Sequence, residues 1–152
     1  MKLSDTLALD RVTLALSSTD KDGAIKELLD MLNQSVPLSD PEAVLKRILY
    51  EESIMSTGVG SGLGIPHARS DQVDGVVTAL GISPEGIDYG SADGEPVRLV
   101  FLILSSVSAM PAYMSVLSRT SRIFDQEEMR NRVLAAESAE EIINLIRSQE
   151  PI

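Results

Sequence analysis

Residues 97–104, VRLVFLIL, form the most apolar stretch of the chain and decide its fold class. A run of this length is far too short to span a bilayer. It is typical of a central strand whose two faces are both covered by other elements. Shorter apolar patterns at residues 12–16 and 76–82 predict two further strands.

Apolar residues at helical spacing predict five helices between and after these strands. The expected segments are residues 19–32, a helix from Pro41, residues 111–124, residues 125–134 and a helix from Ser138. Their expected capping residues are Thr19, Asp40, Asp125 and Ser138, the last in a capping box with Glu141. On the third helix, Met114, Leu117 and Phe124 share the expected apolar spacing. Because helices alternate with strands, we expect an α/β fold with helices packed on a sheet, in one domain over residues 1–152.

The composition excludes several classes of site. Cysteine is absent and histidine occurs once, which excludes a disulfide framework, a cysteine nucleophile, thiolate metal sites and a histidine-rich zinc site. The chain carries 13 basic and 23 acidic residues, a formal charge of -10, and such a field repels nucleic acids and anionic membranes. The first residues hold no apolar segment of signal-peptide length, so we expect a cytoplasmic protein without membrane insertion.

The glycine-rich stretch 56–64, STGVGSGLG, interrupts the helical pattern. Where no Cβ intervenes, backbone N–H groups can approach a phosphate, so this stretch could bind an anion. It lacks the Gly-Lys-Ser/Thr ending of a P-loop and the spacing of a dinucleotide-binding loop. A tight connection between a helix and a short strand explains the same glycines, and a sensor of small anions would also use them. The residue pattern leaves these interpretations open.

The only histidine, His67, follows this stretch and is preceded by Pro66. A neutral imidazole is nucleophilic near neutral pH, which suits reversible group transfer, although a single histidine is also common as a structural or surface residue. Proline restricts its own φ and the residue before it, so it can hold the direction of this histidine. A Ser-His-Asp hydrolase is disfavoured because no G-x-S-x-G sequence occurs. Glu51 and Glu52 are adjacent on a helix, do not face each other and are expected to be solvated.

Several motifs along the chain resemble those of one bacterial family. They are STGVG at 56–60 with GIPHA at 64–68, DGEPV at 93–97 followed by LVFL at 99–102, residues 117–124, and AEEI at 139–142. Together they resemble the enzyme IIA domains of the fructose–mannitol and nitrogen-regulatory class. These domains belong to the bacterial phosphoenolpyruvate-dependent phosphotransferase system, and the resemblance covers nearly the whole chain.

The resemblance implies a mixed, about five-stranded sheet flanked by helices on both faces. It also implies that His67 is phosphorylated by the small phosphocarrier protein HPr, with no cofactor and no metal. The residues that correspond to the loop around the phosphoryl group are Ser56, Thr57, Gly58 and Gly60. In transporting members the phosphoryl group moves to a IIB domain and then to sugar. In nitrogen-class members, which are often single free-standing domains like this chain, the phosphorylation state regulates partner proteins, so we expect the regulatory role.

Two positions depart from the family pattern. Glu51 stands where an arginine is usual, and Tyr113 stands where a second histidine is usual. An arginine would offset the phosphate charge, whereas a glutamate adds to it. Arg47, one helical turn before Glu51, and Arg69, two residues after the histidine, are the candidate replacements. The two hypotheses are a phosphoryl carrier with His67 as acceptor, and a degenerate interaction module that keeps the fold without carrying phosphate.

Overall fold

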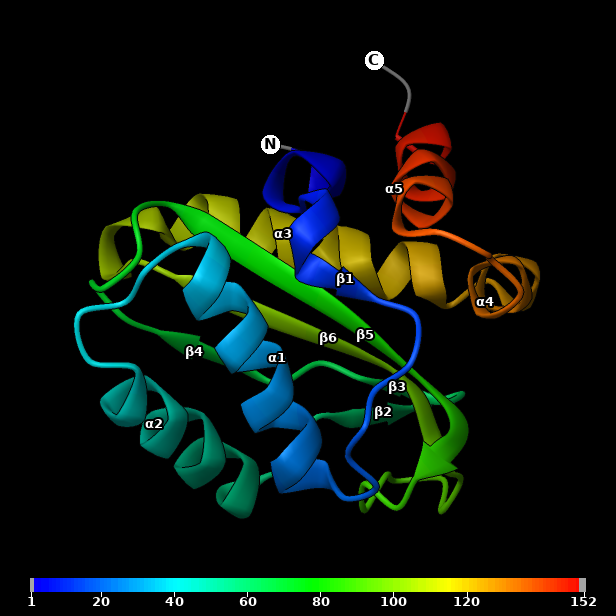
Figure 1. Ribbon diagram of the computed structural model, residues 1–152, viewed down its shortest axis with the longest axis horizontal. Helices are drawn as coiled ribbons and strands as arrows, with labels where there is room; N and C mark the ends of the chain where they lie inside the picture. Colours follow the sequence, from blue (N-terminus) through cyan, green and yellow to red (C-terminus); the bar gives the residue numbers. More distant parts are fainter. Residues whose placement is uncertain (1, 151–152) are drawn as a thin grey trace.

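The apolar run forms the centre of a mixed sheet in the computed structural model, which describes residues 2–150. The sheet has six strands: β1 (Val12–Thr13), β2 (Gly58–Gly60), β3 (Leu63–Gly64), β4 (His67–Arg69), β5 (Val76–Ile87) and β6 (Val97–Ser105). β6 pairs antiparallel with β5 on one side, and β1 lies parallel to β5 at the edge (Figure 1). On its other side β6 pairs in parallel with β3 and then with β4, and β2 runs antiparallel to β3.

Five α-helices in the described residues flank this sheet. They are α1 (Lys21–Ser35), α2 (Pro41–Ile54), α3 (Met110–Phe124), α4 (Glu127–Leu134) and α5 (Ala139–Ser148). Figure 1 shows α1 and α2 on the near side of the sheet and α3 behind it. The mixed α/β fold with helices on both faces is therefore confirmed. The glycine-rich stretch forms β2 and β3, which brings the sheet to six strands rather than about five.

Alternation along β6 explains why both faces of the sheet are apolar. The side chains in the core beneath α1 and α2 are Val100, Leu102 and Leu104. The side chains in the core beneath α3, α4 and α5 are Leu99, Phe101 and Ile103. All six are essentially inaccessible to solvent. A strand buried on both faces reads as a continuous apolar run, and residues 97–104 confirm that prediction.

The helix starts follow the expected capping chemistry in two places and differ in two. Asp40 Oδ1 accepts from Ala43 N at 3.2 Å, and Ser138 Oγ accepts from Glu141 N at 3.1 Å, as predicted. Asp20 rather than Thr19 caps α1, because its carboxylate accepts from Gly23 N at 2.6 Å. Asp125 is also not a helix N-cap: it ends α3, and α4 starts after Gln126.

Three details of the predicted elements are wrong. The Glu141 side chain accepts from Glu137 N rather than closing the capping box on Ser138. The first strand ends at Thr13, although Leu16 N still donates to Ile82 O at 2.7 Å. Met114 is 52% exposed, because the buried face of α3 lies one residue earlier, at Tyr113 and Val116.

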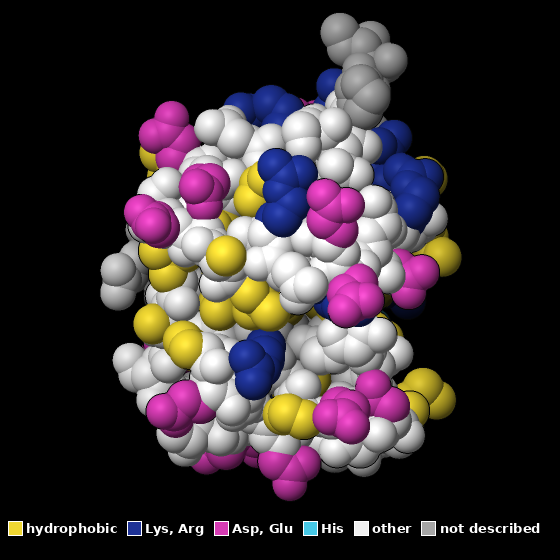
Figure 2. Space-filling model, turned by 90° about the vertical axis from the view of Figure 1, so that its right-hand side faces the viewer, with side chains coloured by type: hydrophobic (Ala, Val, Ile, Leu, Met, Phe, Trp, Pro, Cys, Tyr) yellow, Lys and Arg dark blue, Asp and Glu magenta, His cyan; other side chains and the backbone are white. Residues whose placement is uncertain are grey.

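The outer surface of the described chain gives two further facts. Among residues 2–150 none of the helices combines the length and the apolar character that a membrane span needs. Figure 2 shows one face, on which acidic and basic side chains are interspersed around hydrophobic ones near the middle, with no histidine in view. The cytoplasmic location expected from the sequence stays a prediction.

Candidate functional site

His67 is the first residue of β4, and its ring is held by the backbone just before it. Its Nδ1 lies 2.7 Å from the carbonyl oxygen of Ile65. Because a carbonyl oxygen only accepts hydrogen bonds, Nδ1 carries the proton in this arrangement and Nε2 carries the lone pair. The carbonyl of Pro66 accepts from Ile103 N of β6 at 3.0 Å, which ties this segment to the central strand. The ring is thus fixed in the tautomer that makes Nε2 a nucleophile.

A pocket of about 420 Å³ contains His67 in its wall. The pocket lies where the end of α2, the glycine-rich stretch and α3 meet. Its lining residues are Glu51, Glu52, Met55, Ser56, Thr57, Val59, Ile65, His67, Leu117 and Ser121. Met55 and Val59 are 75% and 59% exposed, so the opening of the pocket is bordered by apolar side chains. Sequence reasoning did not identify these two, because single exposed apolar residues carry no distinctive pattern.

The glycine-rich stretch forms a tight β2–β3 hairpin. Gly60, Ser61 and Gly62 all have positive φ, at 97°, 59° and 80°. Ser61 N donates to Asp93 Oδ2 at 2.9 Å, and Gly58 N donates to Ser56 Oγ at 3.1 Å. These two amides are therefore engaged within the protein. Ser56 and Thr57 line the histidine pocket, whereas Gly58 and Gly60 are not among its lining residues.

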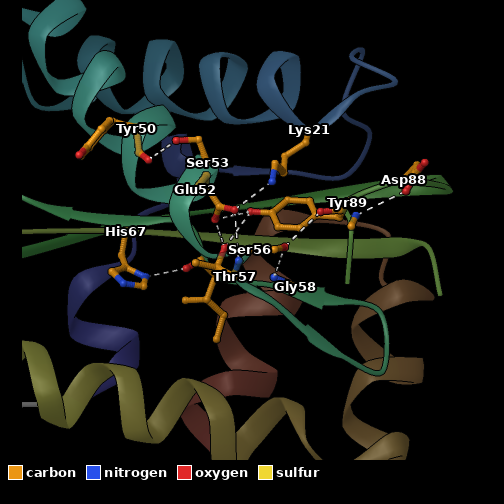
Figure 3. Close-up of polar contacts among 12 residues, drawn as sticks. Lys21, Tyr50, Glu52, Ser53, Ser56, Thr57, Gly58, His67, Asp88 and Tyr89 are labelled. Atoms are coloured by element: carbon orange, nitrogen blue, oxygen red, sulfur yellow. Dashed lines mark hydrogen bonds and ion pairs between the residues drawn. The ribbon is translucent and has the colours of Figure 1, made fainter. Parts of the chain in front are cut away.

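Glu52 is buried, with 4% of its surface exposed, and the expectation of a solvated side chain is wrong for it. Its Oε2 accepts from Lys21 Nζ at 3.2 Å and from Thr57 N at 3.1 Å. Its Oε1 accepts from the Thr57 hydroxyl and, at 3.2 Å, from Tyr89 Oη. Figure 3 shows these four side chains pointing toward one another, with His67 to the left of Thr57. Thr57 lies five residues from Glu52, but Lys21 and Tyr89 lie 31 and 37 residues away, so the sequence carried no signal for this cluster.

Tyr89 closes the cluster from the other side. Burial raises the pKa of its phenol, and the Glu52 carboxylate raises it further. Lys21 Nζ lies 5.1 Å from the centre of the Tyr89 ring, a distance at which a cation is attracted to the ring face. The Tyr89 carbonyl accepts from Ser56 Oγ at 3.2 Å. Tyr89 therefore remains neutral and holds the residues that begin the glycine-rich stretch.

The two candidate arginines lie in different surroundings. Arg47 Nε forms an ion pair with Glu51 Oε1 at 2.9 Å on the exposed side of α2. Arg69 lies two residues beyond His67 on β4, so the two side chains share one face of the strand. Its Nη1 is 4.0 Å from Met110 Sδ at the start of α3. Arg69 is the arginine that the fold places on the histidine side of the strand.

Tyr113 of α3 faces the histidine. Its ring centre is 5.9 Å from that of His67, with the planes tilted by 52°. Burial raises the pKa of the Tyr113 phenol, Glu51 raises it further, and Arg69 opposes both. Glu51 lines the pocket that contains His67, whereas Tyr113 and Arg69 are not among its lining residues. The structure brings together the histidine, both departures from the family pattern and one candidate cation.

Comparisons with known proteins give similarities over nearly the whole chain. The family model described as "Phosphoenolpyruvate-dependent sugar phosphotransferase system, EIIA 2" matches residues 6–149. The chain is 37% identical to a fructose-specific EIIABC component of Bacillus subtilis, over 99% of this chain but only 24% of that protein's length. It is 34% identical to a fructose-specific EIIA component of Haloferax volcanii, over 95% of this chain and 94% of that one.

Solved structures of similar proteins also superpose on nearly the whole chain. The nitrogen regulatory protein IIA-Ntr of Neisseria meningitidis superposes with a TM-score of 0.88 at 28% identity, covering 95% of this chain and 98% of that one. IIA mannitol of Escherichia coli superposes with a TM-score of 0.78 at 22% identity, covering 92% and 98%, and supports the fold alone.

Proposed function

Because the chain belongs to the EIIA 2 family of the phosphoenolpyruvate-dependent sugar phosphotransferase system, we propose that it is a phosphoryl carrier that accepts its phosphoryl group on His67 from an HPr-type phosphocarrier protein. The observation that carries the proposal is the hydrogen bond from His67 Nδ1 to the Ile65 carbonyl. In the neutral ring this bond leaves the lone pair on Nε2, and His67 lines a pocket with an apolar border, into which a partner protein can dock.

The proposed step is a direct displacement at phosphorus. The lone pair of His67 Nε2 forms the new N–P bond, while the bond between phosphorus and the leaving atom of the donor breaks. The electron pair of that broken bond stays with the donor, and the proton stays on Nδ1, hydrogen-bonded to the Ile65 carbonyl, throughout. Nothing is oxidised or reduced, and the reverse of this step passes the phosphoryl group to the next protein. Such transfer depends on positioning and charge stabilisation.

The charges around the pocket assign roles to the other predicted residues. We infer that Arg69 supplies the cation for the phosphoryl oxygens and that Tyr113 supplies a hydroxyl donor. Arg47 is paired with Glu51 and serves to reduce the charge of that carboxylate. The hydroxyls of Ser56 and Thr57 already donate to Tyr89 O and Glu52, so these residues shape the pocket wall. Gly58 and Gly60 shape the hairpin that continues from it.

The next acceptor is either a IIB domain or a regulated protein, and the regulatory role stays a prediction. The nitrogen regulatory proteins of Pseudomonas aeruginosa and Bradyrhizobium diazoefficiens are 23% and 27% identical to this chain. The fructose-specific relatives, at 34% and 37%, are more similar and favour a sugar-specific acceptor as a second candidate. Mixing the phosphorylated chain with a fructose-type IIB domain tests this: transfer of the label supports the sugar route, and full retention supports regulation.

The carrier role itself is tested by incubating the chain with phosphoenolpyruvate, enzyme I and HPr. We expect a mass gain of one phosphoryl group, with an acid-labile and base-stable bond, and no gain in His67→Gln. A degenerate interaction module, for which Glu51 in the pocket wall is the supporting observation, would take up no label. An acid-stable label that survives in His67→Gln would move the chemistry to a hydroxyl group.

A further inference from the structure

A continuous line of contacts joins the buried carboxylate of Glu52 to the imidazole of His67. Thr57 N donates to Glu52 Oε2 at 3.1 Å, Ile65 N donates to the Thr57 carbonyl at 3.1 Å, and His67 Nδ1 donates to the Ile65 carbonyl at 2.7 Å. We propose that Glu52, held by Lys21, is a positioning residue that fixes the tautomer and direction of His67 through this line. The effect on transfer rests on the proposed function, whereas the effect on the imidazole does not.

The first step is that Glu52 is needed as a carboxylate. Its two oxygens accept from four donors: the ammonium of Lys21, the amide and hydroxyl of Thr57, and the phenol of Tyr89. An ionised carboxylate is acceptor-only and has about four lone-pair sites, so every site is used. A glutamine of the same shape would direct an NH₂ group at two of these donors. A buried donor left without an acceptor is unfavourable, so the cluster would rearrange.

The second step is that Glu52 controls where Thr57 lies. Thr57 is bound to this side chain by both its amide and its hydroxyl, so the carboxylate fixes the backbone and the side chain of one residue at once. Tyr89 Oη lies 3.0 Å from Thr57 Oγ1, and because both hydroxyls donate to Glu52, the carboxylate is what joins these two residues. Losing the carboxylate therefore frees the start of the glycine-rich stretch rather than a single side chain.

The third step is that Thr57 controls the acceptor of His67. Ile65 is 2% exposed, and its amide is bound to the Thr57 carbonyl. Its own carbonyl lies in the peptide bond to Pro66, where the proline ring restricts the backbone on both sides. A displacement of Thr57 therefore turns the Ile65 peptide and lengthens the bond to Nδ1. Once that bond weakens, the proton can move to Nε2, and the nucleophilic lone pair is lost from the pocket.

Glu150 provides a matched control within the same chain. It is 3% exposed and accepts from two backbone amides, Leu3 N at 2.7 Å and Ser4 N at 2.9 Å, and from Arg119 Nη1 at 3.2 Å. Both glutamates are thus buried and accept from backbone amides and one cation, one amide for Glu52 and two for Glu150, and of the two only Glu52 is connected to the histidine. Glu150→Gln removes comparable interactions and leaves the line to His67 intact.

The experiment compares the wild type with Glu52→Gln and Glu150→Gln by ¹⁵N NMR of the histidine ring in the unphosphorylated protein. We expect the Nδ1–H tautomer in the wild type and in Glu150→Gln, and a mixture with the Nε2–H tautomer in Glu52→Gln. Phosphorylation by HPr should be about tenfold slower in Glu52→Gln, since misplacing a reacting group by about 1 Å costs one to two orders of magnitude. The Glu150→Gln rate should equal that of the wild type.

Tyr89→Phe is the second variant, because it removes one donor from the carboxylate and keeps the ring. It should shift the tautomer in the same direction as Glu52→Gln but by less, and it decides the matter if Glu52→Gln does not fold. A wild-type ring spectrum in folded Glu52→Gln, or an equal shift in Glu150→Gln, overturns the inference. A tautomer shift in Glu52→Gln without any labelling of the wild type would support the positioning role and refute the carrier role.

Discussion

Replacing Gly64 by alanine tests whether Tyr89 is as firmly held as the cluster requires. An added Cβ at this position would lie 2.8 Å from Tyr89 Cζ and 3.1 Å from two further ring atoms, whereas ordinary contact begins near 3.4 Å. The ring is 1% exposed and its hydroxyl bonds to Glu52, so it has no direction in which to withdraw. Forcing a methyl group against such a ring costs about 3 kcal/mol, at the upper end for overpacked cores. For a chain of 152 residues that corresponds to a fall in Tm of roughly 6–12 °C.

The measurement is urea unfolding of Gly64→Ala beside Gly75→Ala. Gly75 has a φ of 70° and no neighbour within 4 Å of an added Cβ, so its substitution costs only the left-handed backbone strain, about 1 kcal/mol. We also expect the His67 tautomer to shift in Gly64→Ala and to stay unchanged in Gly75→Ala, since only the first displaces Tyr89. A Gly64→Ala variant within about 0.5 kcal/mol of the wild type, the size of an ordinary surface change, would refute the reasoning.

Three further predictions concern the charges near the site. Glu51→Arg should lengthen the half-life of the phosphorylated protein, because it replaces a charge of the same sign as the phosphoryl group with a cation. Adding Tyr113→His should lengthen the half-life further, and by a non-additive amount. The decay of the label in both single variants and in the double variant measures these half-lives. Arg69→Met should slow phosphorylation by about tenfold or more, as expected for loss of a charged partner to the phosphoryl group, with equal rates contradicting the assignment. Backbone hydrogen bonds, the largest from Ser61 N, lower the pKa of Asp93. The carboxylate therefore stabilises the hairpin fully above the unfolded pKa of Asp93, and this stabilisation is lost as the pH falls through the lowered folded pKa. The rate of amide exchange at Ser61 as a function of pH, with Asp93→Asn as control, measures this loss.

The elements that the sequence predicted well are those whose signal is local. The run at 97–104 became β6 because burial on both faces demands apolar residues at every position. Asp40 caps its helix because a cap contacts an amide only three residues away. Thr19 and Asp20 are both suitable N-cap residues for α1, and the backbone direction decides which of them caps the helix. That direction cannot be predicted from the residue types alone.

The candidate site divides in the same way. The sequence predicted His67 as a candidate site residue because it directly follows Pro66, which is a local pattern. The burial of Glu52 was missed because the helical pattern does not show which donors a carboxylate will contact, and two of the donors to Glu52 come from Lys21 and Tyr89, far away in the chain. The tautomer of the imidazole depends on the direction of one carbonyl group, that of Ile65, which no residue pattern reports.

The gap between β3 and β4 has a consequence for what this sheet can host. Both strands pair with β6 along one edge, and Ile65 and Pro66 between them belong to neither strand, although the Pro66 carbonyl still accepts from Ile103 N of β6. In an unbroken strand, such carbonyl groups would accept hydrogen bonds from the amides of a neighbouring strand. Here the Ile65 carbonyl instead accepts the hydrogen bond of the His67 imidazole. If a neighbouring strand bound this carbonyl, the sheet would be more regular and the His67 imidazole would lose its acceptor, so the reactivity proposed for His67 depends on a local irregularity of the sheet.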